Sequence, residues 1–459
     1  NSFLFSLVWS LGATIDTDSR LKFDTFLREL LTGKVEKHPI PASIGKIDNA
    51  FPTDGLVYDF LFEAKGRGNW IHWTKTIKSS NLGGKGTKIS DIIVPTMDTA
   101  RYKFLMDILI RHNKPVMLVG PTGTGKSVYI KDKLMNELDK DKFIPAFLNF
   151  SAQTSAGQTQ DIIMSKLDKR RKGVFGPSLG KKFIIFVDDL NMPALEIYGA
   201  QPPIELLRQY LDHGNWYDKK DTSKISLVDL QFICALGPPG GGRNPVSPRF
   251  VRHFNIISVA KFNDDTMTRI FSSIVSFYFK NNEFPNDVYA LGTQIVSGTM
   301  EIYKSAMTNL LPTPTKSHYT FNLRDFSRVI LGVLLIKKQA LDDKKTVVRL
   351  WVHEVYRVFY DRLVDDKDRA WLHGSLKKVT KEHFKEDFDA LFKHLGTSKN
   401  ITEDDVRSLM FCDFLNPDLL VEDRLYQEVK SMEDLYKIVE QYLDEYNQLH
   451  KAQMNLVIF

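Results

Sequence analysis

Cysteine is scarce in this chain of 459 residues, which contains only Cys234 and Cys412. Two cysteines cannot staple a small secreted domain or supply a cysteine-rich zinc module, and such scarcity is typical of a reducing compartment. The 11 histidines show none of the close spacings that zinc sites use, such as HExxH. The longest apolar run, residues 329–336, is far shorter than the roughly 18 residues that a membrane span needs. We therefore predict neither a zinc centre nor a membrane-spanning segment.

An excess of charge of one sign is also missing. The chain has 62 lysine and arginine residues against 56 aspartate and glutamate residues, a formal net charge of +6. Nucleic-acid-binding proteins usually concentrate positive charge on one face, so this balance predicts no nucleic-acid partner. Hydrophobic residues make up 43% of the chain and charged residues 26%, which is typical of a folded protein with a buried core.

The length exceeds that of one ordinary domain and suggests about three modules of ~150 residues each. The chain begins with Asn1 rather than methionine, and it stops within an apolar run at residues 455–459. We expect it to be part of a longer polypeptide.

Apolar residues near the start of the chain recur at helical spacing. Over residues 1–31 this pattern predicts two helices with a break near Gly12. Residues 38–53 contain three prolines and are predicted to form a loop. Residues 56–73 alternate apolar and polar side chains on either side of two glycines, which predicts a β-hairpin. A flexible link is predicted over residues 81–88.

From residue 92 onward, short apolar runs alternate with helical patterns. The runs predicted to be strands cover residues 115–119, 143–150, 183–187, 230–235 and 254–259. Such strands, separated by helices, form βαβ units with a parallel sheet covered on both faces. Beyond Asp264 helical patterns dominate. They predict helices over residues 266–279, 288–309, 323–341, 346–363 and 431–449. The sequence therefore predicts an α/β region followed by an α-helical region.

The first predicted strand runs directly into a segment that matches GxxxxGK[ST], the pattern of a phosphate-binding loop. The segment consists of Gly120, Pro121, Thr122, Gly123, Thr124, Gly125, Lys126 and Ser127. Its glycines permit a tight bend, and its amides and the following helix N-terminus would face a triphosphate. Lys126 would reach the β- and γ-phosphates, and the hydroxyl of Ser127 would ligate Mg²⁺. The alternative is a glycine turn without a nucleotide, but the strand before it and the helix after it favour nucleotide binding.

A second parallel strand would supply acidic groups to the same site. Residues 182–190 contain five consecutive apolar residues that end in Asp188 and Asp189. Asp188 would hold Mg²⁺ through water, and Asp189 would orient or polarise the attacking water. The alternative is a buried strand that ends in a helix-capping aspartate. The combination with the phosphate-binding loop favours the catalytic interpretation.

Five stretches of the chain carry a resemblance to a known family. They are residues 3–30, 94–109, 186–218, 237–256 and 319–335. On these stretches the chain resembles the AAA+ modules of dynein heavy chains, most closely the third module of the axonemal kind. The resemblance implies a P-loop NTPase (AAA+) fold, in which a parallel sheet flanked by helices precedes an all-α small subdomain. It also implies a parent motor that carries six such modules in a ring and moves on microtubules.

The resemblance divides the chain into four parts. Residues 1–90 would form a helical and hairpin lead-in that joins the preceding module. Residues 91–265 would form the large α/β nucleotide-binding subdomain, and residues 266–400 the small helical subdomain. Residues 401–459 would begin the following module.

Two positions depart from the pattern of active AAA+ ATPases. The second acidic residue of the family is usually glutamate, whereas Asp189 is one methylene shorter. The sensor-one position usually carries asparagine, whereas Gly237 has no side chain to contact the γ-phosphate or water. Both departures bear on turnover more than on binding. The rest of the glycine-rich segment 237–243 is interpreted as a structural loop, because no Lys-Ser pair follows it.

The resemblance assigns roles to two arginines and to two residues before the phosphate-binding loop. Arg249 resembles the arginine finger that reaches the nucleotide of a neighbouring module; Arg252 is the second choice, and a surface ion pair is the alternative for either. Arg324 resembles sensor two, which contacts the γ-phosphate, and its alternative is a helix-surface arginine. Val94 and Pro95 match the stretch that packs on adenine, and their alternative is a plain strand end.

The chain is thus expected to bind ATP or ADP together with Mg²⁺. It is expected to act as an AAA+ regulatory module that hydrolyses ATP slowly. The expected catalytic residues are Asp189, Lys126 and Arg249. The alternative is a structural ring module that holds a nucleotide permanently. The expected partners are neighbouring modules of the same heavy chain and, through the parent protein, microtubules and dynein light and intermediate chains. The expected location is the cytoplasm and cytoskeleton, in the axoneme of a cilium or flagellum.

Overall fold

The computed structural model describes residues 1–41, 43–44, 51–77, 83–84, 87–89, 92–396 and 398–457. The loop predicted over residues 38–53 and the link predicted over residues 81–88 lie partly outside these residues. The chain divides into two compact units. The α/β unit comprises Asn1–Ser79 and Pro95–Phe262, and the helical unit comprises Ser80–Val94 and Asn263–Phe459.

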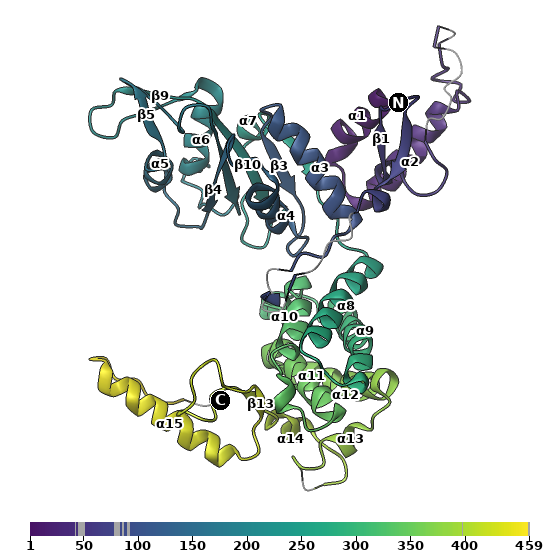
Figure 1. Ribbon diagram of the computed structural model, residues 1–459, viewed down its shortest axis with the longest axis vertical. Helices are drawn as coiled ribbons and strands as arrows, with labels where there is room; N and C mark the ends of the chain where they lie inside the picture. Colours follow the sequence, from purple (N-terminus) through teal and green to yellow (C-terminus); the bar gives the residue numbers. More distant parts are fainter. Residues whose placement is uncertain are drawn as a thin grey trace. The chain divides into compact units, whose positions relative to one another are not determined.

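A five-stranded parallel sheet forms the centre of the α/β unit, in the order β11-β3-β10-β7-β4. Figure 1 labels β3, β10 and β4 of this sheet. Its strands are β3 (Val116–Val119), β4 (Phe143–Asn149), β7 (Lys182–Asp188), β10 (Leu230–Leu236) and β11 (Asn255–Ser258). Each strand carries apolar side chains on both faces, because helices cover the sheet on both sides. The α/β fold with a parallel sheet, predicted from the sequence, is therefore confirmed.

The two faces of this sheet bury separate apolar clusters. Helices α3 (Met97–Arg111) and α4 (Lys126–Asp132) pack on one face, and their side chains surround Ile184 and Phe186 of the central strand β7. Helices α5 (Ala156–Met164) and α6 (Pro202–His213) cover the other face, against Phe183 and Ile185. Successive side chains of β7 thus point alternately into the two apolar clusters. A shift of the strand by one residue would exchange these side chains between the clusters, so the burial fixes the strand register.

The register also brings three chain segments to one edge of the sheet. Val119 at the end of β3 pairs with Leu236 at the end of β10, and Val187 of β7 pairs with Cys234 of β10. Because these strands are parallel, the loops that follow them emerge at the same carboxyl edge. The segments after residues 119, 188 and 236 therefore lie side by side there.

A second, four-stranded sheet extends the α/β unit, in the order β5-β6-β9-β8. Its strands are β5 (Asp168–Arg171), β6 (Val174–Gly176), β8 (Asn215–Tyr217) and β9 (Lys224–Leu227). The apolar patterns of the sequence do not predict these strands, since they contain only three or four residues and several of them are charged. Phe175 and Leu227 pair in this sheet, and both contribute to the core beside α5 and α6.

The first part of the chain agrees with its predicted organisation. Helix α1 (Ser2–Ser10) and helix α2 (Thr17–Leu31) flank a short 3₁₀ turn that begins at Gly12. Strands β1 (Phe60–Glu63) and β2 (Asn69–His72) form the predicted antiparallel hairpin. The Tyr58 hydroxyl donates a hydrogen bond of 2.9 Å to the Gly12 carbonyl, which connects the turn before the hairpin to the helix break.

Most of the helical unit consists of helices that bury apolar side chains. They are α8 (Asp264–Asn281), α9 (Asn286–Asn309), α10 (Leu323–Val333), α11 (Lys344–Val358), α12 (Asp366–Val379), α13 (Phe388–Leu391), α14 (Glu403–Arg407) and α15 (Met432–Leu449). A short hairpin of β12 (Phe411–Cys412) and β13 (Gln427–Glu428) precedes α15. None of the described helices is both long and apolar enough to span a membrane.

Two helices of this unit end earlier than their apolar patterns predict. The helix predicted over residues 323–341 ends at Val333, and the helix predicted over residues 346–363 ends at Val358. The apolar pattern continues in both cases because the following turns are also buried, with Leu334 and Ile336 in the core. Apolar periodicity alone cannot separate a buried turn from a further helical turn.

A buried carboxylate lies within the helical unit. Glu354 of α11 is only 8% exposed, and the Tyr426 hydroxyl donates a hydrogen bond of 2.8 Å to its Oε1 atom. The carboxylate packs over Gly332, where an added Cβ would lie 2.0 Å from Oε2. Burial raises the pKa of Glu354 to about 7, against the opposing effects of the Tyr426 hydrogen bond and the Arg357 charge.

We expect the substitution Glu354→Gln to change how stability depends on pH. Because the pKa is raised on folding, this group contributes stability below its unfolded-state pKa and loses it as pH rises through about 7. Between pH 5 and pH 8 the wild-type chain should lose about 2.5 kcal/mol of unfolding free energy that Glu354→Gln retains, because each pKa unit corresponds to about 1.4 kcal/mol and part of the loss occurs below pH 5. Chemical denaturation at both pH values measures this difference. Equal pH dependence in the two proteins would contradict it.

Candidate functional site

The segment between β3 and α4 is shaped by its glycines. Gly123 and Gly125 have φ angles of +86° and +79°, in the left-handed region that favours glycine. At Gly120 an added Cβ would lie 2.4 Å from the carbonyl oxygen of Val259, so the backbone just after β11 leaves no room for a side chain. The Tyr129 amide then bonds to the Gly125 carbonyl and begins helix α4. The two fixed glycines of the pattern are thus required by the backbone geometry, Gly125 by its positive φ angle and Gly120 by its close approach to Val259.

The ammonium group of Lys126 lies inside the curve of this loop. Its Nζ atom donates hydrogen bonds of 2.7 Å to the carbonyl oxygens of both Gly120 and Pro121. The side chain is only 9% exposed. Thr124 closes the loop by donating from its Oγ1 atom to the Pro121 carbonyl, at 2.9 Å. A positive charge and a helix N-terminus therefore converge within one bent segment, which is the arrangement that binds a polyphosphate.

Two oxygen groups meet beside the loop. The Ser127 hydroxyl on the first turn of α4 donates a hydrogen bond of 2.8 Å to Asp188 Oδ1 at the end of β7. Mg²⁺ is a hard cation that takes oxygen ligands and usually keeps several waters. A serine hydroxyl and a carboxylate held together at a phosphate-binding loop fit such an ion.

The neighbouring aspartate begins a turn. Asp189 has a φ angle of +50°, and its amide donates a hydrogen bond of 3.1 Å to Asp188 Oδ1. This bond holds the Asp188 carboxylate in place while the chain turns away from β7. Asp189 is half-buried and follows Asp188 at the carboxyl edge of the sheet, the position that the sequence predicts for a water-orienting acid.

Two further residues join the site that the sequence patterns do not identify. Asn191 is completely buried, and its Nδ2 atom donates a hydrogen bond of 2.8 Å to the Gly237 carbonyl. Arg243 ends the glycine-rich loop after β10, and its Nη2 atom donates a hydrogen bond of 3.0 Å to Thr122 Oγ1 in the phosphate-binding loop. The sequence gives no sign of these contacts, because the partners lie far apart along the chain. The strand order brings them together.

The two candidate arginine fingers differ in their surroundings. Arg252 forms an ion pair of 2.7 Å with Asp212, which lowers the pKa of Asp212 to about 2, with Arg208 as a further partner. Arg249 lies on the short helix α7 (Pro248–Val251), is exposed, and has no side-chain partner among the described residues. Arg252 is therefore engaged on the surface of its own unit, whereas Arg249 is available to a neighbour.

The remaining predicted site residues are divided between the two units. Arg324 is exposed on the first turn of α10, which Asn322 caps by accepting a hydrogen bond of 2.8 Å from the Arg324 amide. Val94 is buried and belongs to the helical unit, whereas Pro95 belongs to the α/β unit. Their roles toward a nucleotide stay predictions.

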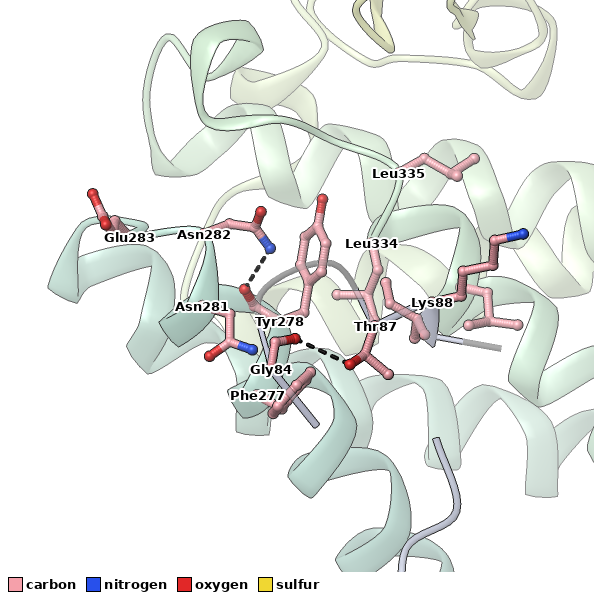
Figure 2. A pocket seen from close by; sticks show the side chains of 12 residues that line it. Gly84, Thr87, Lys88, Phe277, Tyr278, Asn281, Asn282, Glu283, Leu334 and Leu335 are labelled. Carbon is pink, nitrogen blue, oxygen red and sulfur yellow. Dashed lines mark hydrogen bonds between the residues drawn. The ribbon is translucent and has the colours of Figure 1, made fainter. Parts of the chain in front are cut away.

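A pocket of about 790 Å³ lies within the helical unit, beside the end of α8 and the end of α10 (Figure 2). Phe277, Leu331 and Leu335 contribute to its apolar wall. Among its lining residues, the Thr87 hydroxyl donates a hydrogen bond of 3.0 Å to the Gly84 carbonyl, as Figure 2 shows. None of the residues predicted for the nucleotide site lines this pocket.

Three family models match separate parts of the chain. The model described as "P-loop containing dynein motor region" matches residues 84–262. The model described as "Dynein heavy chain AAA lid domain" matches residues 1–75, and an "AAA+ lid domain" matches residues 295–396. The first of these ranges contains the phosphate-binding loop and both aspartates.

Similar proteins extend over the whole chain. Dynein axonemal heavy chain 12 of Homo sapiens is 61% identical over 458 residues, and its counterpart in Mus musculus is 61% identical over 459 residues. Dynein axonemal heavy chain 3 of Mus musculus is 50% identical over 459 residues. All of this chain is covered, but it spans only 15% of the length of the first two relatives and 11% of the third.

Proposed function

Since the chain belongs to the dynein heavy chain family, we propose that it is an ATP-binding AAA+ module that regulates a microtubule motor. The module couples its nucleotide state to rotation of its subdomains within the motor ring. Within the ring it occupies the third position, as the resemblance of its motifs implies. It gates the main motor site rather than producing force itself.

One observation carries the nucleotide-binding proposal. The Ser127 hydroxyl bonds to Asp188 at 2.8 Å, immediately beside a loop whose curve already holds the Lys126 ammonium group. Lys126 binds the β- and γ-phosphates of ATP, or the phosphates of ADP, while Ser127 and Asp188 hold Mg²⁺. The ion would neutralise phosphate charge when bound. The loop residues 120–127 supply backbone amides, and Val94 and Pro95 pack on adenine.

Hydrolysis at this site is proposed to be slow. Asp189 orients or polarises the attacking water, but its side chain is one methylene shorter than the glutamate usual in AAA+ ATPases. Gly237 supplies no side chain to the γ-phosphate. Arg324 acts as the sensor-two residue for the γ-phosphate, and Arg249 acts as the arginine finger for a neighbouring module.

A second candidate function is a structural ring module that holds a nucleotide permanently. Gly237 and Asp189 favour it, because both weaken the groups that position water. The intact Lys126, Ser127 and Asp188 serve either function, since both require a bound nucleotide. Turnover alone separates the two.

Single-turnover hydrolysis tests the choice between these functions. We expect slow conversion of ATP to ADP that Asp189→Asn abolishes, measured with the module that donates the arginine finger present. Nucleotide binding by Asp189→Asn should stay normal, which serves as the internal control. A bound ATP that remains unchanged for hours in the wild-type protein would establish the structural function instead.

The parent protein sets the proposed partners and location. The relatives are named as axonemal heavy chains, which supports a place in the axoneme of a cilium or flagellum. Neighbouring modules of the same heavy chain contact this one, and microtubules and light and intermediate chains bind through the parent. The division into a lead-in (1–90), a large subdomain (91–265), a small subdomain (266–400) and the start of the next module (401–459) belongs to the same proposal.

A further inference from the structure

The space that a side chain at position 237 would occupy is already filled. An added Cβ on Gly237 would lie 2.8 Å from Arg243 Nε and 3.0 Å from Arg243 Cζ. The guanidinium group of Arg243 therefore packs directly on the Gly237 backbone. The position of Arg243 therefore depends on Gly237, because the guanidinium group fits there only when residue 237 has no side chain.

The loop that carries Arg243 is anchored at both ends. Gly240 and Arg243 exchange two backbone hydrogen bonds, of 3.1 and 3.2 Å, which close the glycine-rich turn. The Asn244 amide bonds to the Asn191 carbonyl at 3.0 Å, and Asn191 in turn donates to the Gly237 carbonyl. The arginine thus projects from a fixed turn that is tied to the segment after Asp189.

The guanidinium group reaches the phosphate-binding loop but lacks a countercharge. Its Nη2 atom bonds to Thr122 Oγ1 at 3.0 Å, while its Nε atom is buried and has no partner within the described part of the chain. No carboxylate among the described residues pairs with it. An unpaired buried donor on a cation is costly, and a guanidinium group satisfies phosphate oxygens better than any other side chain does.

We propose that Arg243 contacts the terminal phosphate of ATP from within the same module, in place of the side chain that Gly237 lacks. This inference rests on the proposed nucleotide binding and adds a specificity residue to it. The γ-phosphate supplies the anion that Arg243 lacks, and Thr122 holds the guanidinium group over the loop. Arg243 therefore makes the site distinguish ATP from ADP, although its sensor-one position is a glycine.

Nucleotide titration of the wild-type and variant chains tests this role. With Mg²⁺ present, Arg243→Ala should weaken the binding of ATPγS ~10–100-fold. This range corresponds to the loss of one or two charge-assisted hydrogen bonds. Binding of ADP should change by less than about threefold, since ADP lacks the group that Arg243 contacts. Arg243→Lys should restore part of the ATPγS affinity, because it keeps the charge without the planar fork. Arg111→Ala, which removes an exposed arginine from α3, is the matched control and should leave both affinities unchanged.

A second variant keeps the arginine but moves it. Gly237→Ala places a Cβ within 2.8 Å of Arg243 Nε and should displace the guanidinium group, so it should cause the same selective loss of ATPγS binding. An unchanged ratio of ATPγS to ADP affinity in Arg243→Ala, alongside normal ADP binding, would overturn the role of Arg243 alone. Failure of the wild-type chain to bind either nucleotide would overturn the proposed function as well.

Discussion

Replacing Lys126 with alanine is expected to weaken the binding of both ATP and ADP ~10²–10³-fold, the effect of removing one partner of a buried charge pair. The ammonium group lies inside the loop, within 2.7 Å of the Gly120 and Pro121 carbonyls. These carbonyls offer the ammonium group only partial negative charges, whereas phosphate oxygens would offer it full negative charges. Equilibrium titration with fluorescent ADP and ATP analogues measures the loss.

A second buried lysine provides the control. Lys133 follows α4, is also buried, and forms ion pairs of 2.8 Å with Asp107 and 3.0 Å with Glu137. Lys133→Ala should lower the free energy of unfolding while leaving the nucleotide affinity within a few-fold of wild type, because its partners lie away from the phosphate-binding loop. A folded Lys126→Ala variant with unaltered affinity would refute the proposed site.

Replacing Arg249 with alanine is expected to slow hydrolysis at the neighbouring module's site by ~10³-fold or more, the range that arginine fingers supply in phosphoryl transfer. Arg249 is exposed on α7 and has no side-chain partner among the described residues, so its charge is available outside its own unit. The variant should be tested in the full heavy chain, because the proposed target of Arg249 is a site in another module. Single-turnover hydrolysis at that site measures the rate.

The other arginine of the same segment separates this role from a general effect of charge. Arg252 is held by Asp212 at 2.7 Å on the surface of its own unit. Arg252→Ala should therefore cost some stability of the α/β unit but leave the neighbouring hydrolysis rate nearly unchanged. The assignment fails if Arg252→Ala slows hydrolysis more than Arg249→Ala does.

The phosphate-binding loop shows where local sequence is sufficient. Gly125 requires a positive φ angle and Gly120 a close approach to Val259, and each demand removes nearly every residue except glycine. Lys126 and Ser127 directly follow Gly125 in the sequence, so they necessarily occupy the first turn of α4. The side chains of residues 120–127 were therefore predictable as a unit.

Strands could be predicted where burial on both faces made the sequence continuously apolar. Residues 183–187 read as a strand because helices cover both sides of β7. Strand β5, by contrast, consists of four charged residues. It pairs with β6 through its backbone, and its sequence contains no apolar run from which a strand could be predicted. Helix ends were missed where buried turns continued the apolar pattern beyond Val333.

The sequence by itself determined the groups on which the proposed chemistry rests: a loop for phosphates, a hydroxyl and a carboxylate proposed for a magnesium ion, and an acid proposed for water. Only the tertiary structure decided which distant groups meet them. Arg243 and Thr122 are 121 residues apart, and they touch because β10 inserts beside β3 in the sheet. Likewise, Asp212 pairs with Arg252, and the Arg249 side chain has no such partner among the described residues. Such contacts depend on strand order and on charges brought together by folding, which no local pattern encodes.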